Sequence, residues 1–242
     1  MRSGLLVITF LIFTFSCDQS EKVATYYDDG HLKSEGRLIK GFKEGESKVY
    51  YPSGRIKEKG NWKNNKQEGE WILYYDIDDK ISSRVNFKDD FQTGLSVFYY
   101  ENGTKKEESY WGEGKLEGKS SLYYENGKLK QEGIWHDGLK SGEFHSYYDD
   151  GGILQIGKYI EGKEEGTFLT YHRNGKLMNE MPWVNGKLNG NSKSFFDNGN
   201  LEQEGSFKDG EFDGAWRVYS SEGPIITTRQ YDKGILLTES RK

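Results

Sequence analysis

The chain has 242 residues, of which 33% are hydrophobic and 15% are aromatic, and 31 of them are glycine. Few aliphatic and many aromatic side chains argue against one ordinary compact core and favour small units that bury rings on their neighbours. With 34 basic and 39 acidic residues, the formal net charge is −5, so the sequence offers neither a basic patch for nucleic acid nor an acidic tail.

The N-terminal segment differs from everything that follows it. A basic start leads into an apolar run from Gly4 to Phe15, which is shorter than the roughly 20 residues that a spanning helix needs. We interpret residues 1–16 as a lipoprotein signal peptide, because the chain's single cysteine, Cys17, follows directly. Residues 14–17 resemble a bacterial lipobox, which implies cleavage before Cys17 and lipidation of its thiol. The alternative is a plain secretory signal with an incidental cysteine. Residues 17–25 are predicted to be a short tether.

From residue 26 to residue 242 the sequence repeats. Each unit opens on a pair of aromatic residues and has glycine at its fifth position in all units except the third. The nine units start at Tyr26, Tyr50, Tyr74, Tyr99, Tyr123, Tyr147, Tyr171, Phe195 and Tyr219, a step of 24 residues that becomes 25 once, after Tyr74. A fixed period of this size indicates a repeat architecture.

Each unit is predicted to be a β-hairpin. Asn126 and Gly127 in unit five are typical of a tight turn, and the flanking segments alternate polar and apolar residues. Position 13 is aromatic in eight of the nine units and lies on the same strand face as position 11, which is Gly133 in unit five. The glycine there leaves room for a neighbouring ring. A second turn, ending in a glycine at position 20 in eight units, closes each unit.

The sequence therefore predicts an all-β fold, an elongated repeat array of about nine 24-residue hairpins that form a twisted antiparallel meander. At ~4.8 Å between strands, about 18 strands extend on the order of 85 Å. Unit nine has Pro224 after its turn and Thr238 in place of the closing glycine, which is typical of a terminal cap. Pro182 lacks a ladder donor, so it predicts a local irregularity in unit seven.

The residues of the array resemble a known repeat. Segments such as Gly60–Trp71 resemble the MORN repeat, and the Tyr-Tyr-x-x-Gly-x-Leu-Lys-x-Glu-Gly element resembles its bacterial variant, often labelled a YwqK-family antitoxin. The resemblance covers residues 26–242. It implies stacked hairpins in an elongated, grooved sheet, no catalytic residues, and a role in scaffolding, protein interaction or phospholipid contact. The antitoxin label implies a cytosolic toxin as partner, which an export signal argues against.

No constellation in the sequence predicts catalysis, a cofactor or a bound metal, because a repeat supplies only copies of each side chain. The four histidines occupy four different unit positions, and His172 replaces the second ring of unit seven. We interpret it as a ring substitute in the packing. Asp76, Asp78 and Asp79 lie in the unit with the inserted residue; they predict a longer solvated turn, with a Ca²⁺ site as the alternative.

The aromatic pairs provide the candidate binding surface. Adjacent rings in a strand point to opposite faces, so one row can be exposed and can stack on sugars, bind an extended peptide or lie against lipid headgroups. The alternative is that the rings only hold the sheet together. The candidate surface consists of Tyr27, Tyr51, Tyr75, Tyr100, Tyr124 and Tyr148.

These features together predict a non-enzymatic scaffold in the bacterial cell envelope, anchored to the membrane through Cys17 and binding an unknown protein partner rather than nucleic acid. A first alternative is a cell-wall glycan-binding module, since choline-binding repeats carry similar Gly-x-Trp-x-Tyr-Tyr runs. A second is an antitoxin-like protein that binds a partner toxin.

Overall fold

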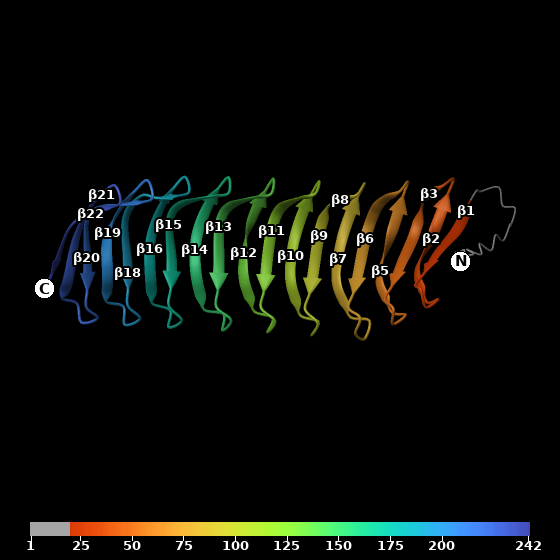
Figure 1. The fold of residues 1–242 in the computed structure, drawn as a ribbon, viewed down its shortest axis with the longest axis horizontal. Helices are drawn as coiled ribbons and strands as arrows, with labels where there is room; N and C mark the ends of the chain where they lie inside the picture. Colours follow the sequence, from red (N-terminus) through yellow and green to blue (C-terminus); the bar gives the residue numbers. More distant parts are fainter. Residues whose placement is uncertain (1–19) are drawn as a thin grey trace, which may run out of the picture.

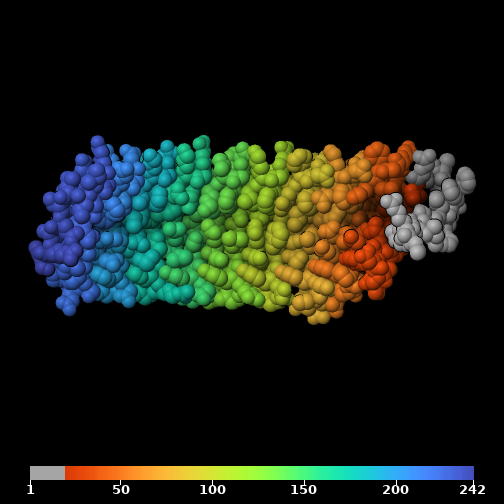
Figure 2. Space-filling model, viewed as in Figure 1, coloured from red at the N-terminus to blue at the C-terminus, as the bar shows by residue number. Residues whose placement is uncertain are grey.

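The computed structural model describes residues 20–242, which form one antiparallel sheet whose strands follow one another in chain order (Figure 1). The space-filling view shows the same succession along one elongated body (Figure 2). None of the described residues forms a helix long and apolar enough to cross a membrane. The predicted elongated β meander is therefore confirmed.

The described residues form 22 strands. They are β1 (Ser20–Tyr26), β2 (Leu32–Ile39), β3 (Phe42–Lys43), β4 (Gly45–Tyr50), β5 (Ile56–Lys63), β6 (Lys66–Tyr74), β7 (Ile81–Lys88), β8 (Phe91–Gln92), β9 (Gly94–Tyr99), β10 (Lys105–Gly112), β11 (Lys115–Tyr123), β12 (Leu129–His136), β13 (Leu139–Tyr147), β14 (Ile153–Ile160), β15 (Lys163–Tyr171), β16 (Leu177–Val184), β17 (Lys187–Leu188), β18 (Gly190–Phe195), β19 (Leu201–Lys208), β20 (Glu211–Tyr219), β21 (Ile225–Asp232) and β22 (Ile235–Arg241).

Three of the strands are interrupted at a single residue. β3 and β4, β8 and β9, and β17 and β18 are the pieces, separated by Glu44, Thr93 and Asn189. Counting each pair as one strand leaves one strand more than nine hairpins supply. The additional strand is β1, which begins at Ser20 and so includes most of the segment expected to be a tether. Because Tyr26 ends a strand as the later first-position rings do, the first hairpin needs β1 as the partner of β2.

The turns at the two edges of the sheet differ. After the aromatic pair, a short loop has one left-handed residue, Gly127 (φ 83°) in unit five, whose N–H donates to the Tyr124 carbonyl at 2.9 Å. At the other edge both residues of the turn are left-handed, as at Asp137 (φ 53°) and Gly138 (φ 80°), which is the hairpin turn whose twist matches the strands. The position-5 glycine thus marks a hairpin tip, as predicted, but the tightest turn is the other one.

Glycine at position 11 makes room for a ring, as predicted. A Cβ atom on Gly133 would lie 2.5 Å from the Phe144 ring. Phe144 meets Trp135 and Tyr159 edge to face, with ring centroids 5.8 Å and 5.0 Å apart. Phe144 occupies position 22 of the unit, so positions 11 and 22 face each other across two neighbouring strands.

The facing positions exchange volume along the array. In the first eight units these pairs are Gly36–Ser47, Gly60–Trp71, Val85–Ser96, Ser109–Ser120, Gly133–Phe144, Gly157–Phe168, Met181–Ser192 and Gly205–Trp216. Rings at position 22 stand only opposite glycine, and every larger residue at position 11 stands opposite serine. The rings lie on one face of the sheet in three runs of edge-to-face contacts, around Trp71, around Phe144 and Phe168, and around Trp216. We call this the ring face.

The irregularity predicted in unit seven is present, but proline is not its cause. There the strand breaks at Asn189, whose N–H donates to the Pro182 carbonyl at 2.9 Å. Units one and three break at the equivalent residue with the equivalent hydrogen bond, and neither has a proline there. The three units share a serine at position 22. Unit four also has this serine and keeps an unbroken strand, so the missing ring accompanies the break without being sufficient for it.

Candidate interaction surface

The six tyrosines predicted as a binding surface connect neighbouring hairpins. Each phenol O–H donates to the carbonyl of the first-position residue of the next unit, for example Tyr27 to Tyr50 at 2.6 Å and Tyr124 to Tyr147 at 2.7 Å. The other donors are Tyr51, Tyr75, Tyr100 and Tyr148, at 2.6–2.8 Å. Their rings are half-buried. Their hydroxyl groups therefore stabilise the stacking of the repeats.

His172 continues this ladder. Its Nε2 lies 2.8 Å from the Phe195 carbonyl oxygen, which accepts, so the hydrogen-bonded tautomer carries its proton on Nε2. The interpretation of His172 as a substitute ring is confirmed. Basic side chains cover several rings of the ladder: Lys130 Nζ lies 5.5 Å from the Tyr124 ring centre, and the Arg173 guanidinium lies 4.6 Å from that of Tyr148.

The first-position rings lie on the opposite face, which we call the charged face, beside the residues of positions 10 and 23. Tyr147 O–H donates to Glu132 at 3.0 Å, and Lys119 Nζ lies 2.8 Å from the same carboxylate. The hydrogen bond from Lys119 holds the pKa of Glu132 below its usual range. In unit one, burial and the hydrogen bond to Glu35 raise the pKa of Tyr50 to about 12.

An apolar patch interrupts the charged face in unit six. Positions 10 and 23 pair across the strands as Glu35 with Lys48 in unit one and as Glu180 with Lys193 in unit seven. In unit six the equivalent pair is Ile156 and Leu169. The four half-buried residues that form what we call the apolar patch lie on β14 and β15: Leu154, Ile156, Leu169 and Tyr171.

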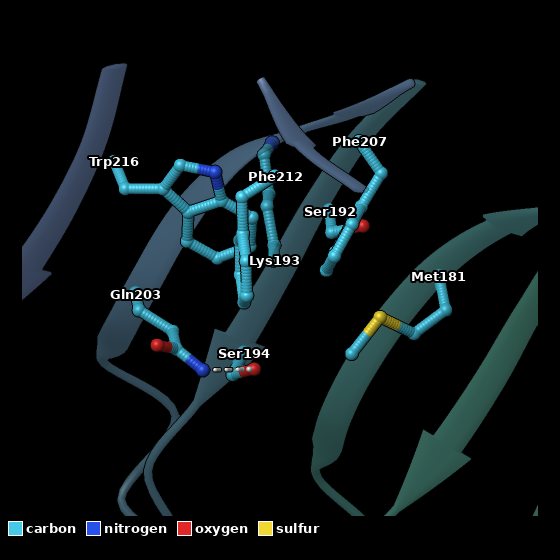
Figure 3. A pocket seen from close by; sticks show the side chains of 8 residues that line it. All are labelled: Met181, Ser192, Lys193, Ser194, Gln203, Phe207, Phe212 and Trp216. Atoms are coloured by element: carbon cyan, nitrogen blue, oxygen red, sulfur yellow. Dashed lines mark hydrogen bonds between the residues drawn. The ribbon is translucent and has the colours of Figure 1, made fainter. Parts of the chain in front are cut away.

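On the ring face the runs of rings stop at unit seven and leave a hollow of about 340 Å³, part of it open to solvent. Its lining, drawn in Figure 3, consists of Met181, Ser192, Lys193, Ser194, Gln203, Phe207, Phe212 and Trp216. Gln203 Nε2 donates to Ser194 Oγ at 3.4 Å. Ser192 is only 2% exposed, and its hydroxyl has no hydrogen-bond partner. The sequence pattern did not reveal this hollow, although serine at position 22 opposite methionine marks it.

The remaining residues that the sequence singled out have structural surroundings or lie outside the described range. Asp78 and Asp79 have φ angles of 49° and 51°, in the longer turn that was predicted, and Asp76 accepts a hydrogen bond from Ser53 Oγ. Within residues 20–242 no group of three His, Cys, Asp or Glu side chains could hold a metal ion. Cys17 and the signal segment lie outside the described residues.

Comparison with protein families identifies the repeat. Five segments match the family described as MORN repeat variant, at residues 43–64, 92–115, 116–137, 164–185 and 188–209. The matches recur with the 24-residue period or twice and three times that spacing, allowing for the inserted residue. The chain therefore contains MORN-variant repeats, as the resemblance predicted.

Among curated proteins the sequence has no match. Among solved structures it is similar to a TcdB2-TccC3-Cdc42 complex, at 13% identity over 89% of this chain and 13% of that chain, with a TM-score of 0.19. A Photorhabdus luminescens Tc holotoxin pore gives 13% identity over 88% of this chain and 12% of that chain, again with a TM-score of 0.19. The chain thus spans only a small part of these structures, and so low a score supports no conclusion on fold or function.

Proposed function

We propose that this chain is a non-enzymatic scaffold of the bacterial cell envelope that binds a protein partner through the apolar patch on its charged face. MORN-variant repeats support the first part, because such repeats are generally protein- or membrane-binding modules. The sheet leaves both of its faces without a covering layer of structure among the described residues (Figure 1). Each face is thus open to a partner over many repeats.

The single observation that carries the proposal is the exchange of a charged pair for Ile156 and Leu169. An exposed apolar patch rimmed by polar residues is typical of a protein interface, where the apolar centre loses water and the charged rim sets register. Charged groups flank the patch on both sides, Glu132 in the preceding unit and Glu180 in the following one. A partner with an apolar centre and basic flanks complements this surface.

The membrane anchor in this proposal is a diacylglycerol group on Cys17. The apolar run of residues 4–15 and the small residue before Cys17 support it. Because β1 begins at Ser20, at most roughly 10 Å of chain separates the acylated cysteine from the first strand. The array would begin directly at the membrane surface.

A photo-cross-linking amino acid at Tyr171 tests the interaction surface in full-length protein in its native cells. We expect one discrete adduct, which the double variant Ile156→Glu with Leu169→Lys abolishes. That variant copies the pair Glu180 and Lys193 of the next unit and so preserves the fold. The matched control exchanges that pair, Glu180→Lys with Lys193→Glu, and should keep the adduct. An adduct that survives the I156E/L169K change would refute the patch, and no adduct at all would refute the scaffold.

The intact mass of protein purified from its native membrane tests the anchor. We expect the loss of residues 1–16 and the gain of acyl chains, and a Cys17→Ala variant that stays unprocessed or leaves the membrane fraction. An unmodified full-length protein in the soluble fraction would contradict the envelope location. It would favour the alternative of a cytosolic antitoxin that binds a toxin.

A further inference from the structure

We propose that the hollow in unit seven of the ring face receives one aromatic side chain, a tyrosine or a tryptophan, from a partner polypeptide. This inference rests on the proposed function only in taking the partner to be a protein. The apolar patch lies on the opposite face of the sheet, so the two sites are separable by experiment. The hollow and its lining are drawn in Figure 3.

The position of the hollow in the runs of rings indicates its occupant. On one side Phe168 and Trp183 meet edge to face at 6.0 Å, which ends one run. On the other side Phe207 meets Trp216 at 5.1 Å and Phe212 at 4.9 Å, which begins the next. In units six and eight the place equivalent to Ser192 holds a ring of the chain itself. A guest ring in unit seven would therefore continue the edge-to-face packing that aromatic pairs prefer.

The unpartnered hydroxyl of Ser192 selects among rings. In unit three the equivalent Ser96 receives a hydrogen bond from Gln92 Nε2 at 2.8 Å, whereas unit seven has Leu188 in place of that glutamine. A buried hydroxyl without a partner is unfavourable, and each such group in a folded protein needs an explanation. A phenol or an indole brings an O–H or N–H group to its ring edge and can satisfy Ser192. The ring of phenylalanine cannot.

The size and the walls of the hollow fit one ring. A cavity of about 150 Å³ in another protein holds benzene, so the hollow of about 340 Å³ has room for a single aromatic group. Phe207, Phe212 and Trp216 supply apolar walls, and the long thioether side chain of Met181 lies at the opposite side (Figure 3). Methionine adapts its shape to a guest and packs favourably against aromatic rings, so it can move aside as the ring enters.

Side-chain analogues test the site on the full-length protein. We expect p-cresol and 3-methylindole to shift the NMR signals of the Met181 methyl group and the Trp216 indole N–H, saturably and with millimolar affinity. Toluene, which lacks the polar edge, should bind several-fold more weakly, and Ser192→Ala should remove that preference. A saturable shift that is absent for all three probes would refute the site. Equal binding of toluene and p-cresol would refute the role of Ser192.

The repeats supply a matched pair of variants. Met181→Gly with Ser192→Phe copies the Gly133–Phe144 pair of unit five and fills the hollow with the chain's own ring, so probe binding should be lost. Val85→Gly with Ser96→Phe makes the same exchange in unit three and should leave binding unchanged. If the unit-seven variant still binds p-cresol at Trp216, the hollow is not the binding site.

A capped peptide, acetyl-Gly-Ser-Tyr-Ser-Gly-amide, tests the source of the ring. We expect it to shift the same two signals at least as strongly as p-cresol; binding of p-cresol with exclusion of the peptide would refute a polypeptide occupant. The cross-link at Tyr171 should survive the Met181→Gly with Ser192→Phe exchange. Loss of the probe signals with that cross-link intact counts against this inference alone, whereas probe binding without any cross-link counts against the scaffold alone.

Discussion

Units six and seven follow each other in the chain, and they solve the same packing problem in two ways. In unit six Gly157 lies under the 5% exposed ring of Phe168, and β15 is unbroken. In unit seven Met181 faces Ser192, the strand breaks at Asn189, and a hollow remains. The comparison shows that the array tolerates an exchange of volume between two facing positions without losing its period.

The edges of the sheet explain this tolerance. In both units the glycine of the tight turn donates to a carbonyl of the preceding unit, Gly162 to Lys140 at 2.9 Å and Gly186 to Glu164 at 3.0 Å. At the other edge Tyr148 and His172 make equivalent bonds to the next unit. These contacts involve backbone atoms and edge residues, so they do not depend on what fills positions 11 and 22. The edges fix the stacking, and the facing pair fixes the local packing.

The largest expected effect comes from emptying the ring position of unit six. Phe168→Ala removes contacts with Tyr159 and Trp183 and leaves a cavity above Gly157, so we expect a loss of about 3–5 kcal/mol in the free energy of unfolding. Urea unfolding followed by circular dichroism measures it. As the control, Phe91→Ala removes a ring that is 58% exposed and should cost far less. Equal losses would mean that ring burial does not stabilise the array.

The next effect comes from overfilling the same unit. Gly157→Val places a Cβ 2.2 Å from the Phe168 ring, and overpacking of this kind costs about 1–3 kcal/mol. Adding Phe168→Ser recreates the Val85–Ser96 pair of unit three. A double-mutant cycle should therefore show the double variant to be more stable than the sum of the two single losses. Additive losses would contradict the exchange of volume.

The tyrosine ladder can be shortened or extended by one rung. Tyr124→Phe removes the donor to the Tyr147 carbonyl and should cost about 0.5–1.5 kcal/mol. Unit eight has Phe196 at the equivalent position, so Phe196→Tyr should add a donor to the Tyr219 carbonyl and stabilise the array by a similar amount. Amide hydrogen exchange of the adjoining hairpins measures both. Effects of the same sign would show that the ring, and not the hydroxyl, decides.

Much of the fold could be predicted from the sequence, because the period, the turn glycines and the position-11 glycine are local signals. The partner of that glycine could not be predicted. A left-handed glycine at position 20, such as Gly142 (φ 78°), lies two residues before Phe144 and shifts the register between β12 and β13, so counting alternate residues fails there. The tyrosine ladder was missed as an internal contact for a similar reason. Alternation separates the two rings of a pair, but only the stacking of units 24 residues apart brings the hydroxyl of Tyr124 to a carbonyl.

The smallest effect, one of sign, comes from removing the two serine hydroxyls that units three and seven share. Ser96→Ala leaves Gln92 without its acceptor and should cost about 1 kcal/mol, whereas Ser192→Ala removes a buried hydroxyl without a partner and should be neutral or stabilising by up to about 1 kcal/mol. Urea unfolding of both variants measures the difference. If Ser192→Ala costs as much as Ser96→Ala, the hydroxyl of Ser192 already has a partner in solution, and a guest ring would have no unpaired group to satisfy in unit seven.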